Sequence, residues 1–199
     1  MSIAEREPVL SEMLAFIHAR LREETPHPCV IIHGPIGAGK TSTAARLAAA
    51  LKEQGIAVGG LLSPRIVERI VEQDETIGYT ARDIMTGEER PFAGLTLPGI
   101  AIGRFYIRQT GIAFARRAIE RAAASTQVVF VDEVGRLECD GKGHAPAVRR
   151  LLRSQALPVL LVRSVFVERV VETFGIARYA LFPVDTSLPT LSLEGGMLR

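Results

Sequence analysis

The sequence predicts an α/β fold in which helices flank a mostly parallel sheet. Short runs of valine, isoleucine and leucine, such as CVIIH at 29–33, alternate along the chain with segments of helical periodicity. That alternation is typical of parallel strands covered by helices on both faces. At 199 residues and 47% hydrophobic content, the chain is long enough to bury the core of one compact domain.

The first elements surround a glycine-rich stretch. Residues 9–22 carry apolar side chains at helical spacing, which predicts an amphipathic helix that ends before the two prolines of 25–28. The apolar run at 29–33 is suited to a buried strand. An alanine-rich helix is expected at 41–55, closed by Gly55, and a further strand at 56–63. The glycines after residue 33 therefore join a strand to a helix.

The middle of the chain predicts a small antiparallel hairpin inserted into the parallel sheet. Apolar and polar residues alternate at 65–71 and 76–85 around EQDE, and TGEE after them predicts a turn. One more strand is expected at 101–107 and a helix at 111–125.

The last third of the chain returns to alternating strands and helices. Strands at 127–133 and 158–162 enclose a glycine-bearing loop and a helix at 145–154, and a final helix is expected at 164–175. The residues from 183 onward show no clear period, and no function is assigned to them.

Charge balance and cysteine count limit the function classes. The formal net charge is only +2, so nucleic acid is not expected as a partner. The two cysteines are too few for a disulfide framework, no apolar run is long enough to cross a membrane, and the charged N-terminus does not fit a signal peptide. We expect a cytoplasmic protein without a membrane partner, and we favour a monomer.

Residues 34–41, GPIGAGKT, match the pattern G-x-x-x-x-G-K-[ST] of a phosphate-binding loop, the P-loop or Walker A motif, in its required position between a strand and a helix. Without bulky side chains the loop can turn its amides toward a phosphate, and the next helix adds the positive end of its dipole. Lys40 is expected to reach the β- and γ-phosphates and is assigned a catalytic role. The predicted nucleotide-binding residues are Gly34, Pro35, Ile36, Gly37, Ala38, Gly39, Lys40, Thr41 and Ser42.

The run VVFVDE predicts the other half of the site, a Walker B strand. Asp132 follows four apolar residues at the carboxyl end of a buried strand, where open α/β sheets place their ligands. With the hydroxyl of Thr41, it is predicted to bind Mg²⁺ as the cofactor. Glu133 is assigned as the general base that activates water against the γ-phosphate. This assignment favours hydrolysis, because a kinase must exclude water.

An arginine on the transferring phosphoryl group would accelerate hydrolysis by about 10³- to 10⁵-fold. Arg65, Arg104, Arg136 and Arg163 all lie near predicted strand ends or loops. Arg136 is the preferred candidate because it follows the two carboxylates within one loop. The chain contains no asparagine, which excludes the Asn-Lys-x-Asp guanine motif of Ras-type GTPases.

Taken in chain order, GPIGAGKT, GGLLSP, ETIGYTARDIMTGE, GRFYI and VVFVDEVGRLE resemble the motifs of the small P-loop nucleoside-triphosphatases, the family of the cancer-related nucleoside-triphosphatase and its thermostable relatives. The similarity spans 29–176, and DEVGRLE looks like the Asp-Glu-Ile-Gly-Lys-Met-Glu segment of that family. The resemblance implies a RecA-like fold and slow, Mg²⁺-dependent hydrolysis of ATP, GTP and other nucleoside triphosphates to diphosphate and phosphate.

The resemblance also assigns roles by position. It places the P-loop on 34–41, the magnesium aspartate on Asp132, the general base on Glu133 and a basic residue on Arg136. We therefore expect an N-terminal helical extension at 1–28, a P-loop NTPase domain at 29–182 and a C-terminal tail at 183–199.

Two other functions stay open at this point. A kinase would pass the γ-phosphoryl group to a nucleoside or another small molecule, with Arg149, Arg150 and Arg153 as a lid over the site. A nucleotide-dependent switch or assembly factor would instead use slow hydrolysis to time its release from a partner.

Overall fold

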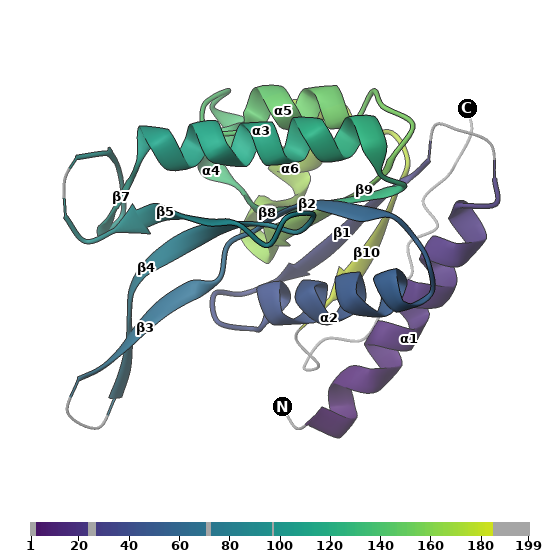
Figure 1. The fold of residues 1–199 in the computed structure, drawn as a ribbon, viewed down its shortest axis with the longest axis horizontal. Helices are drawn as coiled ribbons and strands as arrows, with labels where there is room; N and C mark the ends of the chain where they lie inside the picture. The colour runs from purple at the N-terminus through teal and green to yellow at the C-terminus, as the bar shows by residue number, and fades with distance from the viewer. Residues whose placement is uncertain (1–2, 24–26, 71–72, 97, 185–199) are drawn as a thin grey trace.

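A computed structural model describes residues 3–23, 27–70, 73–96 and 98–184 and confirms the α/β class (Figure 1). The strands are β1 (Cys29–Gly34), β2 (Val58–Leu62), β3 (Arg65–Ile70), β4 (Gln73–Asp83), β5 (Glu89–Gly94), β6 (Ile100–Ile102), β7 (Phe105–Ile107), β8 (Val128–Val134), β9 (Leu157–Arg163) and β10 (Tyr179–Pro183). The helices are α1 (Ile3–Arg20), α2 (Lys40–Glu53), α3 (Gln109–Ser125), α4 (Arg136–Cys139), α5 (Ala145–Leu151), α6 (Val167–Phe174) and the 3-10 turn η1 (Ser164–Phe166).

Within these residues the strands form one sheet in the order β10-β1-β9-β8-β2-β4-β5-β7-β6, with β3 paired to β4. The first five strands of this order are parallel neighbours. Strand β9 lies between β1, which leads into the P-loop, and β8, which carries the acidic pair. In this register Gly34 pairs with Arg163 and Val134 pairs with Val162. The carboxyl ends of these three strands therefore meet at one edge of the sheet.

The antiparallel part extends beyond the predicted hairpin. Strands β3 and β4 form that hairpin, but β4 also pairs with β5, and β5 pairs with β7. The single strand predicted at 101–107 is wrong, because the chain turns at Gly103, with φ +57°, and β6 and β7 pair with each other. Strand β5 was not predicted because its sequence, ERPFAG, has a charged start, a proline and no regular alternation.

Three other elements differ from the prediction. The short helix α4 lies inside the loop expected after residue 133, the edge strand β10 forms from residues left unassigned, and the helix expected at 164–175 begins with η1. A single turn or a short edge strand contains too few residues for its periodicity to stand out. Of the tail expected at 183–199, residues 185–199 lie outside the described residues, as do residues 71 and 72 of the predicted hairpin. The other residues of EQDE, Gln73, Asp74 and Glu75, begin β4.

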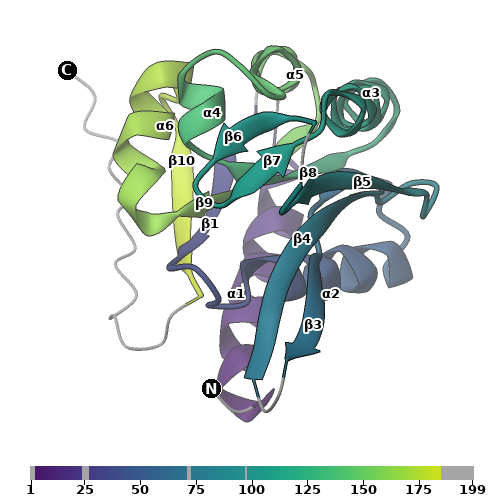
Figure 2. The same ribbon diagram turned by 90° about the vertical axis from the view of Figure 1, so that its left-hand side faces the viewer.

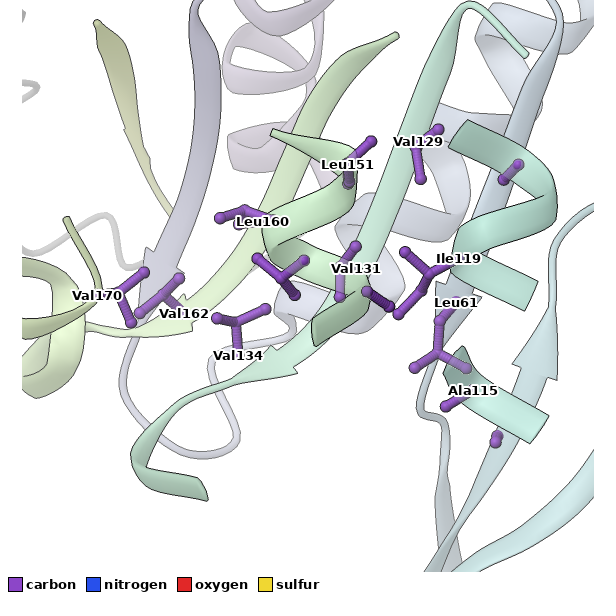
Figure 3. Packing of buried hydrophobic residues seen from close by; sticks show 14 of the residues in the cluster. Leu61, Ala115, Ile119, Val129, Val131, Val134, Leu151, Leu160, Val162 and Val170 are labelled. Atoms are coloured by element: carbon purple, nitrogen blue, oxygen red, sulfur yellow. The ribbon is translucent and has the colours of Figure 1, made fainter. Parts of the chain in front are cut away.

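The sheet lies between two groups of helices (Figure 1), and a cluster of buried hydrophobic side chains fills the space on each face. Helices α3, α5 and α6 cover one face, and Figure 3 shows Ile119 and Leu151 from these helices against Val131 and Leu160 of the sheet. Such fully buried side chains each contribute about 1.5–3 kcal/mol relative to exposure. Because both faces are covered, the central strands contain continuous apolar runs, VVFV in β8 and VLLV in β9, rather than an alternating pattern.

The other face of the sheet is covered by α2 and α1. Met13 and Ile17 of α1 have no exposed surface, and Phe16 packs edge-on against Phe182 of β10 with 5.6 Å between ring centroids. The predicted N-terminal helix therefore contributes to the core beside the outer strand β10. Within the described ranges, no helix is long and apolar enough to span a bilayer.

Gly60 is a position in this sheet at which a side chain cannot fit. Its φ is +106°, and a Cβ there would lie 2.0 Å from the backbone oxygen of Phe130 on β8. We expect Gly60→Ala to lower the free energy of unfolding by about 3 kcal/mol or more, because left-handed strain adds to overlap with a fixed backbone. Urea unfolding measures the loss.

Gly94→Ala is the matched control, since nothing lies within 4 Å of a Cβ at that strand position. Its effect should stay below about 1 kcal/mol. Equal losses in the two variants would contradict the steric explanation.

Candidate active site

The P-loop connects the end of β1 to the first turn of α2. Gly37 and Gly39 have φ values of +82° and +93°, a conformation that costs other residues about 1–2 kcal/mol. Helix α2 begins at Lys40 and has no side-chain cap at its N-terminus. The first amides of an uncapped helix can donate to an anion, and the helix dipole favours negative charge there. The predicted loop residues therefore form a segment suited to phosphate.

The Lys40 ammonium lies against the loop itself. Its Nζ donates to the carbonyl oxygens of Gly34 at 2.9 Å and Pro35 at 2.8 Å. Burial lowers the pKa of Lys40, while the negative charges of Glu133 and Asp132 raise it. The cation is thus placed between the P-loop and the acidic end of β8.

Asp132 is the most tightly held side chain of the site. It is 1% exposed, and its Oδ2 accepts hydrogen bonds from Thr41 Oγ1 at 2.8 Å and from the backbone N–H of Ser63 at 3.0 Å. Its Oδ1 accepts the N–H of Glu133 at 2.8 Å. Burial and the neighbouring Glu133 raise the pKa of Asp132 to about 7, against the lowering effect of these three donors. The carboxylate thereby connects α2, the end of β2 and β8.

Glu133 is placed in the site by a β-bulge. Val131 pairs with Leu160 and Val134 with Val162, so two residues of β8 lie opposite one residue of β9. Successive side chains of a regular strand point to opposite faces, which would separate Asp132 from Glu133. Here both line the same cleft, and Glu133 takes a φ of +57°, the left-handed conformation that a residue with a side chain rarely adopts. Backbone strain is thus located at the proposed general base.

The donor set of the site fits Mg²⁺. The Thr41 hydroxyl and the Asp132 carboxylate are 2.8 Å apart, and both are the hard oxygen ligands that Mg²⁺ prefers. Across the described ranges there is no group of three or more His, Cys, Asp or Glu side chains that could hold a metal. Mg²⁺ is usually bound by one or two carboxylates and shares its other positions with waters and substrate phosphates.

A cleft of about 510 Å³ opens beside the acidic pair and is lined by Lys40 and by three of the four candidate arginines. Arg163 ends β9, and its Nη2 lies 3.5 Å from Glu133 Oε2. Arg136 begins α4 and is exposed at the cleft, while Arg104 pairs with Glu75 at the far wall. Arg65 on β3 does not line it. The structure therefore brings Arg163 to the acidic pair together with the preferred candidate, Arg136.

Ser63 and Glu138 also contribute to this arrangement, although neither is predicted from the sequence. Ser63 donates its amide to Asp132 because β2 is the neighbour of β8 in the sheet. Glu138 is 2% exposed and accepts the N–H of Gly135 at 3.1 Å, so it fixes the loop that leads into Arg136. Its Oε1 lies 3.4 Å from Nδ1 of the buried His144. The signal for Ser63 was its position at a predicted strand end, but the order of the strands could not be deduced locally.

The arginine lid suggested for a kinase does not lie at the site. Arg149 and Arg153 line a second cavity of about 350 Å³ together with Cys29, the first residue of β1. The P-loop follows Gly34 at the other end of that strand. The side chain of Arg150 pairs with Glu120 of α3. These residues therefore cannot close over a phosphate held by the P-loop, and this part of the kinase hypothesis is wrong.

The chain is similar in sequence to proteins of a known family. A family model described as NTPase matches residues 29–185. The nucleoside-triphosphatase THEP1 of Methanopyrus kandleri is 32% identical over 139 residues, which cover 70% of this chain and 74% of that protein. The nucleoside-triphosphatase THEP1 of Thermococcus kodakarensis is 29% identical over 145 residues, which cover 70% and 78% of the two chains.

Two solved structures share the fold. The solution structure of a human cancer-related nucleoside triphosphatase superposes with a TM-score of 0.60 at 20% identity and covers 80% of this chain and 89% of that one. The crystal structure of THEP1 from Aquifex aeolicus gives a TM-score of 0.60 at 18% identity, with 80% and 91% covered.

The strain at Glu133 generates a prediction about stability. We expect Glu133→Gly to have a free energy of unfolding about 1 kcal/mol higher than Glu133→Gln, because glycine adopts positive φ without strain and both changes remove the charge. Denaturant unfolding of the two variants measures the difference. The same two substitutions at Glu168, an exposed position in α6, provide the control, and there glycine should be the less stable by about 1 kcal/mol. If glycine is the less stable at both positions, Glu133 is not strained.

Proposed function

The chain belongs to the nucleoside-triphosphatase family, and we propose that it hydrolyses ATP, GTP and other nucleoside triphosphates slowly, with Mg²⁺, to diphosphate and phosphate. The names of its relatives support the class of reaction. One geometric observation supports the site. The Thr41 hydroxyl at the start of α2 meets Asp132 at 2.8 Å, and the adjacent bulge turns Glu133 into the cleft that Lys40 also lines.

Binding depends on the P-loop. Its amides and the first amides of α2 are proposed to hold the β- and γ-phosphates of the substrate, and the Lys40 ammonium neutralises the charge between them. Thr41 and Asp132 are the residues that would hold Mg²⁺, which shields phosphate charge when bound. The three hydrogen bonds to Asp132 keep its carboxylate oriented toward α2.

The chemical step depends on Glu133. Its carboxylate takes a proton from a water molecule as the water oxygen bonds to the γ-phosphorus. The bond between the γ-phosphorus and the oxygen bridging to the β-phosphate breaks, and the nucleoside diphosphate leaves with that oxygen. Arg163, 3.5 Å from Glu133, is proposed to orient the carboxylate, and the exposed Arg136 to neutralise the transferring group.

Phosphate release by the purified chain tests the proposal directly. We expect release from ATP, GTP and other common triphosphates with Mg²⁺ and no acceptor, and its loss when the metal is chelated. Glu133→Gln should bind ATP as the wild type does and lose phosphate release by about 10²-fold or more, since general-base catalysis contributes roughly 10²–10⁴-fold. Calorimetry and a phosphate assay measure the two effects. Unchanged release would remove Glu133 from its role, and release that depends on an added acceptor would favour a kinase.

The roles of the two arginines are separable by kinetics. Arg136→Ala is expected to lower kcat by about 10³-fold with little change in the affinity for ATP, because a neutralising arginine acts mainly in the transition state. The measurement is steady-state hydrolysis combined with ATP binding. Arg149→Ala serves as the control, because its guanidinium stacks on Phe174 beside the second cavity. If Arg136→Ala keeps the wild-type kcat and only Arg163→Ala loses it, then Arg163 and not Arg136 neutralises the transferring group.

A further inference from the structure

The cleft beside Glu133 has a polar end and an aromatic end. Lys40, Glu133 and Arg163 line the polar end. The antiparallel strands line the rest of the cleft with apolar side chains that form an aromatic wall, namely Tyr79, Phe92, Ile102, Phe105 and Ile107, while Phe166 of η1 lies beside Gly135. Figure 2 shows β6 and β7 lying between β5 on one side and α4 and α6 on the other. The aromatic wall is thus built by the strands that extend the sheet beyond its parallel half.

Hydrolysis by water does not account for this wall. The cleft holds about 510 Å³, whereas a water molecule occupies about 30 Å³ of liquid. Tyr79 and Phe105 remain only partly buried, so the wall keeps apolar surface open to solvent. Apolar concave surfaces of this size with a few polar groups are typical of sites for small organic molecules.

The proposed function places the triphosphate along the P-loop and the first turn of α2. In the proposed function its terminal phosphate faces Lys40 and Glu133, at the polar end of the cleft. Thr41 and Ser42, farther along α2, do not line the cleft. The nucleoside is at the opposite end of the phosphate chain from the γ-phosphate, so the proposed function places it toward Ser42 and not toward the aromatic wall.

The geometry of the wall suits a planar ring. The Tyr79 and Phe105 rings meet edge-on at 5.4 Å between centroids, and the Arg104 guanidinium lies over the Phe105 ring at 5.0 Å. Rings and guanidinium groups arranged in this way offer faces and edges against which another aromatic ring packs. Burial and the charge of Glu133 raise the pKa of the Tyr79 hydroxyl, which agrees with its position facing the polar end.

The charges around the cleft favour an anion. Arg104, Arg136 and Arg163 all line it. Arg104 has Glu75 as a partner and Arg163 has Glu133, but Arg136 has no ion-pair partner among the described residues. A ligand with a phosphate or carboxylate could therefore share the Arg136 guanidinium with the terminal phosphate of the triphosphate.

We propose that the aromatic end of this cleft binds a second small molecule, distinct from the triphosphate, that combines a planar aromatic ring with an anionic group. A nucleoside monophosphate or an aryl phosphate has this chemistry. The inference rests on the proposed function for the position of the terminal phosphate. The second ligand would share the cleft with Glu133 and so can govern the access of water to that carboxylate.

Calorimetry on nucleotide-saturated protein tests the inference. The full chain is saturated with Mg²⁺ and a non-hydrolysable ATP analogue and then titrated with phenyl phosphate or, separately, adenosine monophosphate. We expect one further molecule to bind, and Phe105→Ala to weaken this binding about tenfold, the loss expected for one aromatic stacking partner. Inorganic phosphate, which lacks the ring, should bind at least about tenfold more weakly than phenyl phosphate.

Matched variants separate the outcomes. Phe174→Ala removes a similarly half-buried ring that also lies under an arginine, Arg149 at 4.9 Å, but at the second cavity, and it should leave probe binding unchanged. Ile102→Trp, which fills the cleft from β6, should weaken probe binding as Phe105→Ala does. Circular dichroism checks that each variant is folded.

Three results would overturn the inference. The first is no probe binding to the analogue-saturated wild type at millimolar concentration. The second is binding that both cleft variants leave unchanged. The third is a loss of affinity for the ATP analogue in Phe105→Ala, which would place the nucleotide base in the cleft. Failure of the wild type to bind the analogue at all is a different result, since it refutes the proposed function and the inference that rests on it.

Discussion

The site depends on the hydrogen bonds that converge on the buried carboxylate of Asp132. A carboxylate without exposed surface costs several kcal/mol unless donors surround it. Here the donors come from the Thr41 hydroxyl, the Ser63 amide and the Glu133 amide. Each belongs to a different part of the fold, and a shift of any of them removes one of the three donors of the buried carboxylate. This requirement ties the P-loop helix and two neighbouring strands into one rigid unit.

The same constraint explains the strain beside it. The bulge in β8 brings two successive carboxylates to one side of the sheet, which a regular strand cannot do. The cost is a left-handed conformation at Glu133, about 1–2 kcal/mol for a residue with a side chain. Residues held in such conformations persist only where their surroundings fix them, and they concentrate at functional sites. The hydrogen bonds around Asp132 and the ion pair of Arg163 with Glu133 are those surroundings.

The parallel and the antiparallel half of the sheet form different parts of the cleft. The parallel half aligns the ends of β1, β9 and β8, and so determines where phosphates and the acidic pair meet. The antiparallel half adds β4, β5, β7 and β6, whose apolar side chains line the rest of the cleft. The same cleft thereby combines the proposed site for phosphates with an adjacent apolar surface, which we propose binds another ligand.

The sequence by itself determined the features that depend on neighbours along the chain. The P-loop pattern, the helix after it and the strand ending in Asp132 are local, because glycine conformation, helix periodicity and apolar runs operate over a few residues. The tertiary structure alone decided which strands are adjacent, and hence that Ser63 donates to Asp132 and that Arg163 faces Glu133. It also decided the bulge, the division of 101–107 into β6 and β7, and the position of Arg149 away from the site. These features follow from pairing between distant segments, for which a single sequence contains no local signal.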